Sequence, residues 1–321
     1  MKRVVQCVPN FSEGKDLELI EKIVEPLKNQ EGFKLISYEP DKDYNRTVVT
    51  LLGDPSSMIE PLIKFMAKVT KHVDMNKQKG EHPRMGATDV VPFIPIQNIT
   101  MEECAEIANE MGKRISDTLN IPVFMYAEAA KKADRKSLPS IRKGEFEGMK
   151  DKIKEENWHP DYGNPEIHPT AGVTGVGARM PLIAYNIDLA TEDIEVAKRI
   201  AKAIRGSSGG FKHIQAGPVY LNERKHVQVT MNILNYKQNP IYRIFETVIM
   251  EAKREHVEVP NTEIVGLIPK DTILRSLEYY FDVHNIKHAQ PLTIEQITAF
   301  AKEYLKFRDF DTLKIIEANM E

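Results

Sequence analysis

The sequence predicts an α+β protein of two subdomains, each a split β-α-β (ferredoxin-like) unit whose sheet carries its helices on one face. One reason is length, because 321 residues exceed the usual size of a single hydrophobic core. The other is order, because the hydrophobic patterns of both halves read strand, helix, strand, strand, helix, strand. We therefore expect an N-terminal subdomain at 1–178 and a C-terminal subdomain at 179–321.

In the first half, the short β-branched run VVQCVPNF predicts a buried strand. Ser12 and Asp16 are typical helix caps and predict a helix directly after it. Apolar residues at helical spacing between Ser56 and Asp74 predict a second helix. The predicted strands are 4–11, 33–41, 46–54, 90–96 and 122–127, and the predicted helices are 17–27, 56–74 and a third through Cys104 to Leu119.

In the second half, LIAYNIDLA is a continuous apolar strand pattern, and HVQVTMNILNY alternates with period two. The GSSGG run at 206–210 follows a helix and lacks the Lys-Ser/Thr ending of a phosphate loop, so we interpret it as a helix stop and a flexible turn. The predicted strands are 182–190, 218–223, 226–236 and 263–269, and the predicted helices are 194–204, 240–255, one from 271 and one from 293 to the end.

A sheet with helices on one face leaves the other face open. We expect the two sheets to face each other across a cleft, where small-molecule sites are frequent. The Pro- and Gly-rich piece at 161–180 predicts a functional loop, because glycines let a ligand approach the backbone closely. The basic stretch at 131–143 is interpreted as a solvated loop.

Charge and cysteine content argue against several classes of protein. The 47 acidic and 44 basic residues give a formal charge of −3, so we do not expect nucleic acid as a partner. Cys7 and Cys104 are far apart and lack metal-ligand spacing, which predicts no metal site and fits a reducing cytoplasm. No stretch approaches the roughly 20 apolar residues of a membrane span. The N-terminal apolar run is too short for a signal peptide.

The segment QKGEHPRMGATDVVPFIPI is the most unusual local sequence. Gly80, Pro83 and Gly86 predict a rigid turn that displays His82 and Arg84 at the start of a buried strand. Histidine titrates near neutral pH, which suits it to removing and returning a proton during group transfer. From the residues alone, however, a loop histidine is more often an ordinary surface residue.

Five segments carry a resemblance to a known family: VQCVPNFSEGKD, NRTVVTLLGDP, GEHPRMGATDVVPFIPI, TGVGARMPLIAYNIDL and HVQVTMNILNY. Together they resemble the formiminotransferase domain of formiminotransferase-cyclodeaminase and its stand-alone relatives, in the same order over nearly the whole chain. The resemblance implies an enzyme of one-carbon metabolism and histidine degradation. Such an enzyme moves a formimino group between N-formimino-L-glutamate and N5 of tetrahydrofolate, the co-substrate. The resemblance also implies a cytoplasmic homodimer, with a charged tunnel enclosed by facing sheets.

The resemblance places catalysis on His82, the histidine of the GEHPRMGA motif. It implies folate binding by the family's glycine-rich stretch, which precedes the strand with the GAR motif, here at 177–179. The matching residues here are Gly163, Asn164, Pro165, Glu166, Ile167, His168, Pro169, Thr170, Ala171 and Gly172.

Both substrates carry carboxylates, which a guanidinium can hold with two parallel hydrogen bonds. Arg46, Arg84 and Arg179 are candidates for this role, and asparagines at strand signals within the shared motifs are candidates for other polar atoms. We expect Arg179 and Asn186 to contact the folate, and Asn10, Asn45, Arg46, Arg84 and Asn232 to contact the second substrate.

The sequence departs from the family at two places. Ser37 replaces one residue of a common acidic pair, and Glu39 stands where an aspartate is usual. Glu39 is nevertheless a candidate catalytic residue, which would orient His82 or stabilise its charged form. The stretch 164–170 also differs from the family. The cyclodeaminase domain is absent from the sequence, so we expect no release of ammonia from 5-formiminotetrahydrofolate.

Two alternatives stay open. One is a formyltransferase that moves a formyl group between 5-formyltetrahydrofolate and glutamate through a similar tetrahedral species. The other is a non-catalytic module that binds folate or RNA. An RNA module needs a basic face and exposed aromatic residues on its strands, and the small net charge with 7% aromatic residues argues against it.

Overall fold

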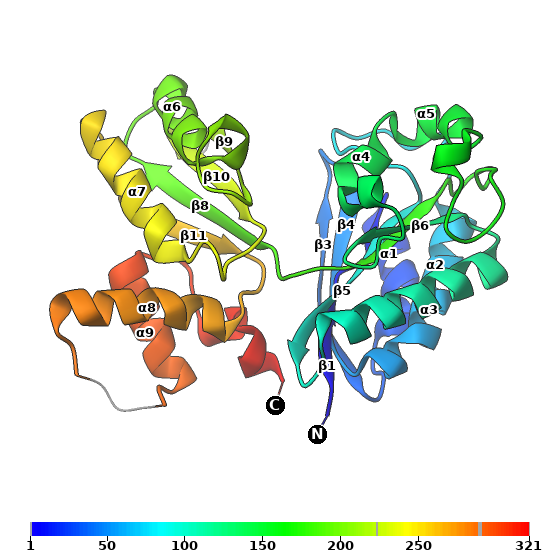
Figure 1. Ribbon diagram of the computed structural model, residues 1–321, viewed down its shortest axis with the longest axis horizontal. Helices are drawn as coiled ribbons and strands as arrows, with labels where there is room; N and C mark the ends of the chain where they lie inside the picture. Colours follow the sequence, from blue (N-terminus) through cyan, green and yellow to red (C-terminus); the bar gives the residue numbers. More distant parts are fainter. Residues whose placement is uncertain (1, 223, 288–290, 321) are drawn as a thin grey trace. The chain divides into compact units, whose positions relative to one another are not determined.

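The computed structural model describes residues 2–222, 224–287 and 291–320. The chain divides into two compact units, Met1–Arg179 and Met180–Glu321. Each unit contains its own sheet, helices and hydrophobic core (Figure 1). The α+β class and the presence of two sheets are thus confirmed. Among the described residues, no helix has the length and apolar character that crossing a membrane requires.

The sheet of the first unit is mixed and has seven strands, with β3 outside β4 and the remaining strands in the order β1-β4-β2-β5-β7-β6. The predicted strand 4–11 forms two strands, since Pro9 lacks the N–H that a continuous ladder needs. The strands are β1 Val4–Cys7, β2 Asn10–Phe11, β3 Phe33–Asp41, β4 Arg46–Gly53, β5 Thr88–Gln97, β6 Val123–Ala127 and β7 Thr174–Ala178.

Three capped helices cover one face of this sheet. The side chains of Asp16, Asp54 and Thr100 each accept a backbone N–H at a helix start, which satisfies donors that a helix leaves free. The apolar faces of these helices pack on the sheet in one continuous core, and α2 and α3 lie side by side in Figure 1. The helices are α1 Leu17–Val24, α2 Pro55–His72 and α3 Met101–Leu119.

Two short helices, α4 Leu138–Arg142 and α5 Glu145–Lys152, cover part of the opposite face. Neighbouring β5 residues point to opposite faces. Val91 packs with α1–α3, whereas Val90 packs with Ile141 of α4 and Met149 of α5. The expectation of helices on one face only is therefore wrong for this sheet, and so is the interpretation of 131–143 as a loop. These segments are rich in charged residues, so their sequence did not show that each helix has one buried side.

The predicted loop 161–180 contains β7, an inner strand that pairs in parallel with β5 and β6. Its glycines are needed for packing. A Cβ at Gly175 would lie 2.9 Å from the Met85 side chain, and one at Gly177 would lie 2.7 Å from the Tyr126 ring. The turn-like composition of this strand therefore reflects close packing of neighbouring side chains over it.

The second unit has a four-stranded antiparallel sheet in the order β11-β8-β10-β9. The predicted helix from 293 does not reach the end of the chain, because it stops at Leu305, before Lys306 in the left-handed conformation (φ 54°). The elements are β8 Ile183–Leu189, α6 Ile194–Ile204, β9 Ile214–Leu221, β10 His226–Ile233, α7 Ile241–Arg254, β11 Thr262–Val265, α8 Lys270–His284 and α9 Ile294–Leu305.

Candidate active site

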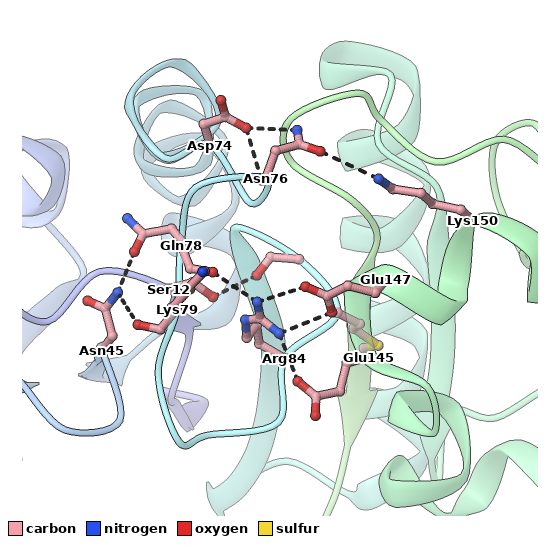
Figure 2. A network of polar contacts seen from close by, with 12 residues as sticks. Ser12, Asn45, Asp74, Asn76, Gln78, Lys79, Arg84, Glu145, Glu147 and Lys150 are labelled. Atoms are coloured by element: carbon pink, nitrogen blue, oxygen red, sulfur yellow. Dashed lines mark hydrogen bonds and ion pairs between the residues drawn. The ribbon is translucent and has the colours of Figure 1, made fainter.

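Hydrogen bonds from polar side chains of the first unit hold the turn that carries His82 in place (Figure 2). The amide of the buried Asn45 donates to the Gln78 side chain and, at 3.0 Å, to the Lys79 carbonyl. The Gln78 amide in turn donates to the buried Glu13 carboxylate at 2.9 Å. These bonds hold the turn from its N-terminal side.

Arg84 holds the same turn from its C-terminal side (Figure 2). Its guanidinium donates to Glu145 at 2.8 Å, to Glu147 at 3.0 Å and to the Gln78 carbonyl at 2.9 Å. The Arg84 carbonyl also accepts the backbone N–H of Phe146 at 2.9 Å. The terminal nitrogens of Arg84, predicted to bind substrate, are thus engaged within the protein, and the residue ties α5 to the His82 turn.

The glycine-rich stretch predicted to bind folate lies beside the His82 turn. Ala87 N–H donates to the Ala171 carbonyl at 2.9 Å, and Val173 N–H donates to the Met85 carbonyl at 3.1 Å. A Cβ at Gly172 would lie 2.4 Å from the Met85 carbonyl oxygen, so only glycine permits this approach. The structure therefore joins the two segments that the sequence singled out separately.

Within this stretch, exposure differs from residue to residue. Residues 163–166 are exposed, whereas Ala171 and Gly172 are buried against the His82 turn. The His168 Nδ1 accepts the backbone N–H of Ala171 at 3.0 Å, so this ring shapes the loop. Burial lowers the pKa of His168, which favours the neutral ring that can accept this bond.

His82 is half-buried, and its ring meets Tyr44 edge-on with the ring centroids 5.9 Å apart. Its Nδ1 is buried and has no hydrogen-bond partner among the described residues. A neutral imidazole has one ring nitrogen that can accept a proton, and the His82 ring as a whole is only half-buried.

Burial, reinforced by the positive charges of Arg46 and Arg142, lowers the pKa of His82 from 6.5 to about 3. Asp41 opposes this effect, since its negative charge favours the imidazolium. At neutral pH the His82 ring is therefore uncharged. An anion that binds beside these arginines would offset their charge and raise the pKa of His82 toward neutrality.

Two arginines approach His82 from different elements. Arg46 begins β4, is half-buried, and lies over the Tyr44 ring at 5.5 Å; burial and the charge of Arg142 lower its pKa. Arg142 ends α4 and forms an ion pair with Asp89. The Nε atoms of both arginines are buried without a hydrogen-bond partner among the described residues. The arrangement therefore offers cationic donors to an anionic ligand.

Further predicted residues lie on the same face of the first sheet. Asn10 points away from the α1–α3 core, and its buried Oδ1 has no hydrogen-bond partner among the residues described. Arg179 follows β7 near the buried Tyr126 ring. Burial raises the pKa of Tyr126, while the charges of Arg179 and Arg142 act in the opposite direction. The charge of Arg142 therefore acts both on His82 and on Tyr126, the neighbour of Arg179.

Glu39 lies on the outer strand β3, opposite Val48 of β4, which in turn lies opposite Asn10 of β2. These paired residues share the open face of the sheet. The Glu39 carboxylate is exposed and accepts a hydrogen bond from Ser37 at 3.3 Å. Its predicted role as the partner of His82 stays a prediction.

Asn186 and Asn232 belong to the second unit, on the polar side of β8 and β10. The Asn186 amide donates to Glu263 of β11 at 3.4 Å. Asn232 is half-buried and lies opposite Gln215 of β9. These residues form a polar sheet surface within the second unit, and their predicted ligand contacts stay predictions.

Sequence reasoning missed Tyr44, Asp89 and Arg142. Asp89 stands next to the predicted strand 90–96, and Arg142 lies in the stretch interpreted as a solvated loop. A usable signal was the sequence SLPSIR, in which a Ser-Leu-Pro start and the apolar Ile141 are typical of a short helix with one buried side. Nothing in the sequence paired Arg142 with Asp89.

Among the described residues, no group of three or more His, Cys, Asp or Glu side chains is arranged to hold a metal ion.

The fold and the site define an α+β enzyme in which an uncharged imidazole lies beside cationic donors. The family model described as "Formiminotransferase domain, N-terminal subdomain" matches residues 4–179, and the one described as "Formiminotransferase domain" matches residues 184–308. The chain belongs to the formiminotransferase family, as its sequence motifs indicated.

Several curated proteins are similar to this chain. It is 46% identical to the glutamate formimidoyltransferase of Streptococcus pyogenes serotype M1, over 90% of this chain and 96% of that protein. It is 40% identical to the glutamate formimidoyltransferase of Thermoplasma acidophilum, over 88% and 93% of the two chains. It is also 40% identical to the formimidoyltransferase-cyclodeaminase of Gallus gallus, over 87% of this chain and 53% of that protein.

Proposed function

We propose that the protein is a glutamate formimidoyltransferase that moves the formimino group of N-formimino-L-glutamate to N5 of tetrahydrofolate. The observation that carries the mechanism is the half-buried His82 ring, which packs against Tyr44 and lies within the electrostatic influence of Arg46 and Arg142. The similarity to glutamate formimidoyltransferases over most of both chains supports the choice of reaction.

In the proposed reaction, N5 of tetrahydrofolate attacks the formimino carbon, and a tetrahedral adduct forms. His82 accepts the proton that N5 loses. The bond between the carbon and the glutamate nitrogen then breaks, and His82 returns the proton to that nitrogen. His82 thus acts first as a base and then as an acid, so the proton taken from N5 is the one returned to the glutamate nitrogen.

In this proposal, Arg46 and Arg142 bind the substrate carboxylate and also set the pKa of His82. With no anion bound, burial together with the charges of Arg46 and Arg142 lowers the pKa of His82 and keeps the ring uncharged. A substrate carboxylate held by these guanidinium groups would partly neutralise them and make His82 a stronger base. In this proposal, binding of the carboxylate substrate activates the catalytic histidine, which later protonates the glutamate nitrogen.

The remaining predicted roles are part of the same proposal. Folate would contact the stretch 163–172 together with Arg179 and Asn186, while Asn10 and Asn232 would contact the second substrate. Glu39 would stabilise the imidazolium. Asn45 and Arg84 are better explained as residues that position the His82 turn, because their polar groups are engaged within the protein.

The experiment replaces His82 with Asn and uses the exposed His72, at the end of α2, for the matched control His72→Asn. Turnover of the His82→Asn protein should fall by about 10²- to 10⁴-fold, the usual contribution of a general base. Binding of folinic acid, followed by calorimetry, should change little. Near-normal turnover of the His82→Asn protein, or an equal loss in the control, would refute the mechanism.

A formyltransferase is the second candidate, since a formyl carbon passes through a similar adduct. Parallel assays with N-formimino-L-glutamate and N-formyl-L-glutamate separate the two reactions. We expect at least tenfold higher kcat/KM with the formimino donor, a difference of about 1.4 kcal/mol. The non-catalytic alternative predicts no turnover with either donor, and a gel shift tests its RNA-binding form.

The broader predictions from the family resemblance also belong to this proposal. They are a cytoplasmic homodimer that serves histidine degradation, and two ferredoxin-like sheets that face each other across a cleft. Sedimentation analysis tests the dimer. A crystal structure with folinic acid tests the cleft, and folate bound on one unit alone would contradict it.

A further inference from the structure

The turn between α6 and β9 in the second unit opens onto a cavity of about 600 Å³. All its lining residues belong to the second unit, between 205 and 234. Its volume falls in the range of small-molecule pockets, roughly 300 to 1,000 Å³. The residues that give it chemical character are Arg205, Lys212, His213, Ile214, Ala216 and Leu234.

The wall of this cavity is preformed, although the sequence predicted a flexible turn at 206–210. Gly210 N–H donates to the Arg205 carbonyl at 3.1 Å, and Leu234 N–H donates to the His213 carbonyl at 2.9 Å. The buried Asn239 side chain donates to the Lys212 carbonyl. A Cβ at Gly210 would lie 2.4 Å from a backbone carbon of α6, so the turn packs tightly against that helix. A preformed wall lowers the ordering cost of ligand binding.

The charge of the cavity has one sign. Arg205, Lys212 and His213 are its ionisable lining residues, and no carboxylate lines it within the described part of the chain. Arg205 donates to the Ser208 hydroxyl at 2.5 Å, and neither Arg205 nor Lys212 forms an ion pair with any described acidic residue. By contrast, Arg199 of the same helix pairs with Glu255 at 2.6 Å. In a chain with a net charge of −3, a cavity with only basic groups favours anions.

We propose that this cavity, which we call the basic hollow, binds a small organic anion that carries carboxylate or phosphate groups. The Arg205 guanidinium can hold either group through two parallel hydrogen bonds, and Lys212 adds a second charge. Ile214 and Leu234 provide apolar contact for the hydrocarbon part of such a ligand. The proposal rests on the lining residues of the second unit, and its test does not use the transfer reaction.

The test titrates the full-length protein with citrate and, separately, with inorganic phosphate, at fixed ionic strength. Calorimetry measures affinity, and backbone amide NMR shifts locate the site. We expect saturable binding that shifts the amides of 206–213. Tighter binding of citrate would identify a carboxylate ligand, and tighter binding of phosphate a phosphate ligand.

The double variant Arg205→Gln/Lys212→Gln should weaken binding at least tenfold. The matched control is Lys202→Gln/Arg254→Gln, which removes the same charge from exposed positions outside the basic hollow. The control should bind within twofold of the parent protein. The proposal is overturned if neither anion binds saturably, if the shifted amides lie elsewhere, or if the control loses as much affinity. The amide shifts of the parent protein locate the bound anion even where a variant folds poorly.

Discussion

The Arg142 guanidinium is paired with the Asp89 carboxylate, on the face of the first sheet that also carries Arg46. The same carboxylate accepts the backbone N–H of Met85 at 2.9 Å, three residues after His82. The Arg142 side chain is 15% exposed and that of Asp89 is 2% exposed, so little water screens the pair. Asp89 therefore links the short helix α4 to the His82 turn, and the positive charge of Arg142 acts on the His82 ring.

Replacing Arg142 with Met should weaken binding of the carboxylate substrate. A hydrogen bond to a charged group contributes about 1.5 to 3 kcal/mol, so the KM for N-formimino-L-glutamate should rise about 10- to 100-fold. The pKa of His82 should rise as well, because Arg142 lowers it in the parent protein. Steady-state kinetics measures the first effect and NMR the second.

Arg114→Met is the control for this substitution. Arg114 pairs with Glu60 at the surface, and both side chains are well exposed. Its replacement should leave KM and the His82 titration unchanged. An unaltered KM in the Arg142→Met protein would mean that the carboxylate binds elsewhere.

The pH titration of His82 provides a second test. Its pKa of about 3 in the folded protein lies below the ordinary value of 6.5. At neutral pH both folded and unfolded chains carry a neutral ring. Below pH 6.5 the unfolded chain takes up the proton first, so His82 reduces stability as pH falls from about 6.5 toward 3.

Ring ¹⁵N NMR should therefore show an uncharged His82 down to pH 4 in the ligand-free protein. With a bound substrate carboxylate, the midpoint should move upward. A ligand-free midpoint near 6.5 would show that neither burial nor the charges of Arg46 and Arg142 act on the ring.

Much of the fold followed from local sequence patterns. The alternation in HVQVTMNILNY and the helix cap Asp16 arise from neighbouring residues, so they can be read without knowing the tertiary structure. The glycines of the His82 turn, Gly80 and Gly86, were also visible in the sequence, although the contacts that require them come from distant residues. A Cβ at Gly86 would lie 1.9 Å from the Val173 carbonyl oxygen.

The missed features depend on contacts between distant residues. β7 contains Gly175 and Gly177, and its strand character comes from pairing with β5 and β6. Arg142 is 53 residues from Asp89 in sequence, and nothing near either residue announces the pair. Charge alone suggested a solvated segment at 131–143, because a short helix shows too little periodicity to reveal its buried side.

Arg84 provides a test of positioning. Replacing it with Met removes its bonds to Glu145, Glu147 and the Gln78 carbonyl. The catalytic turn then loses its connection to α5, so kcat should fall about tenfold while the KM values stay within about threefold. Arg84→Lys keeps one charge and should recover part of kcat. A large rise in KM with kcat unchanged would instead identify Arg84 as a substrate ligand.

Gly172 and Gly148 form a matched pair for backbone packing. An alanine Cβ at Gly172 would lie 2.4 Å from the Met85 carbonyl oxygen, and its φ of +68° disfavours side chains. Gly172→Ala should destabilise the protein by more than about 2 kcal/mol. Gly148 lies inside α5 with nothing within 4 Å of an added Cβ, so Gly148→Ala should stabilise it by about 0.5 to 1 kcal/mol. Denaturant unfolding compares the two. Equal effects would contradict the close approach of Gly172 to the His82 turn.

The strongest stability effect should come from Arg135, whose side chain is fully buried. It pairs with Asp161 at 2.8 Å and donates to the His159 carbonyl at 2.6 Å. Arg135→Met leaves a carboxylate that is 4% exposed without its counter-ion, which should cost about 3 to 5 kcal/mol. Trp158, the single tryptophan, lies three residues before Asp161, so its fluorescence reports unfolding of this unit.

A double-mutant cycle separates the ion pair from general damage. Asp161→Asn alone leaves the buried Arg135 charge without a carboxylate and should also be strongly destabilising. Arg135→Met/Asp161→Asn removes both charges, so its cost should fall below the sum of the single costs by at least about 1 kcal/mol. Arg254→Met at an exposed pair should change stability by less than about 0.5 kcal/mol. Additive costs in the cycle would show that Arg135 and Asp161 stabilise the unit independently, each through its other contacts.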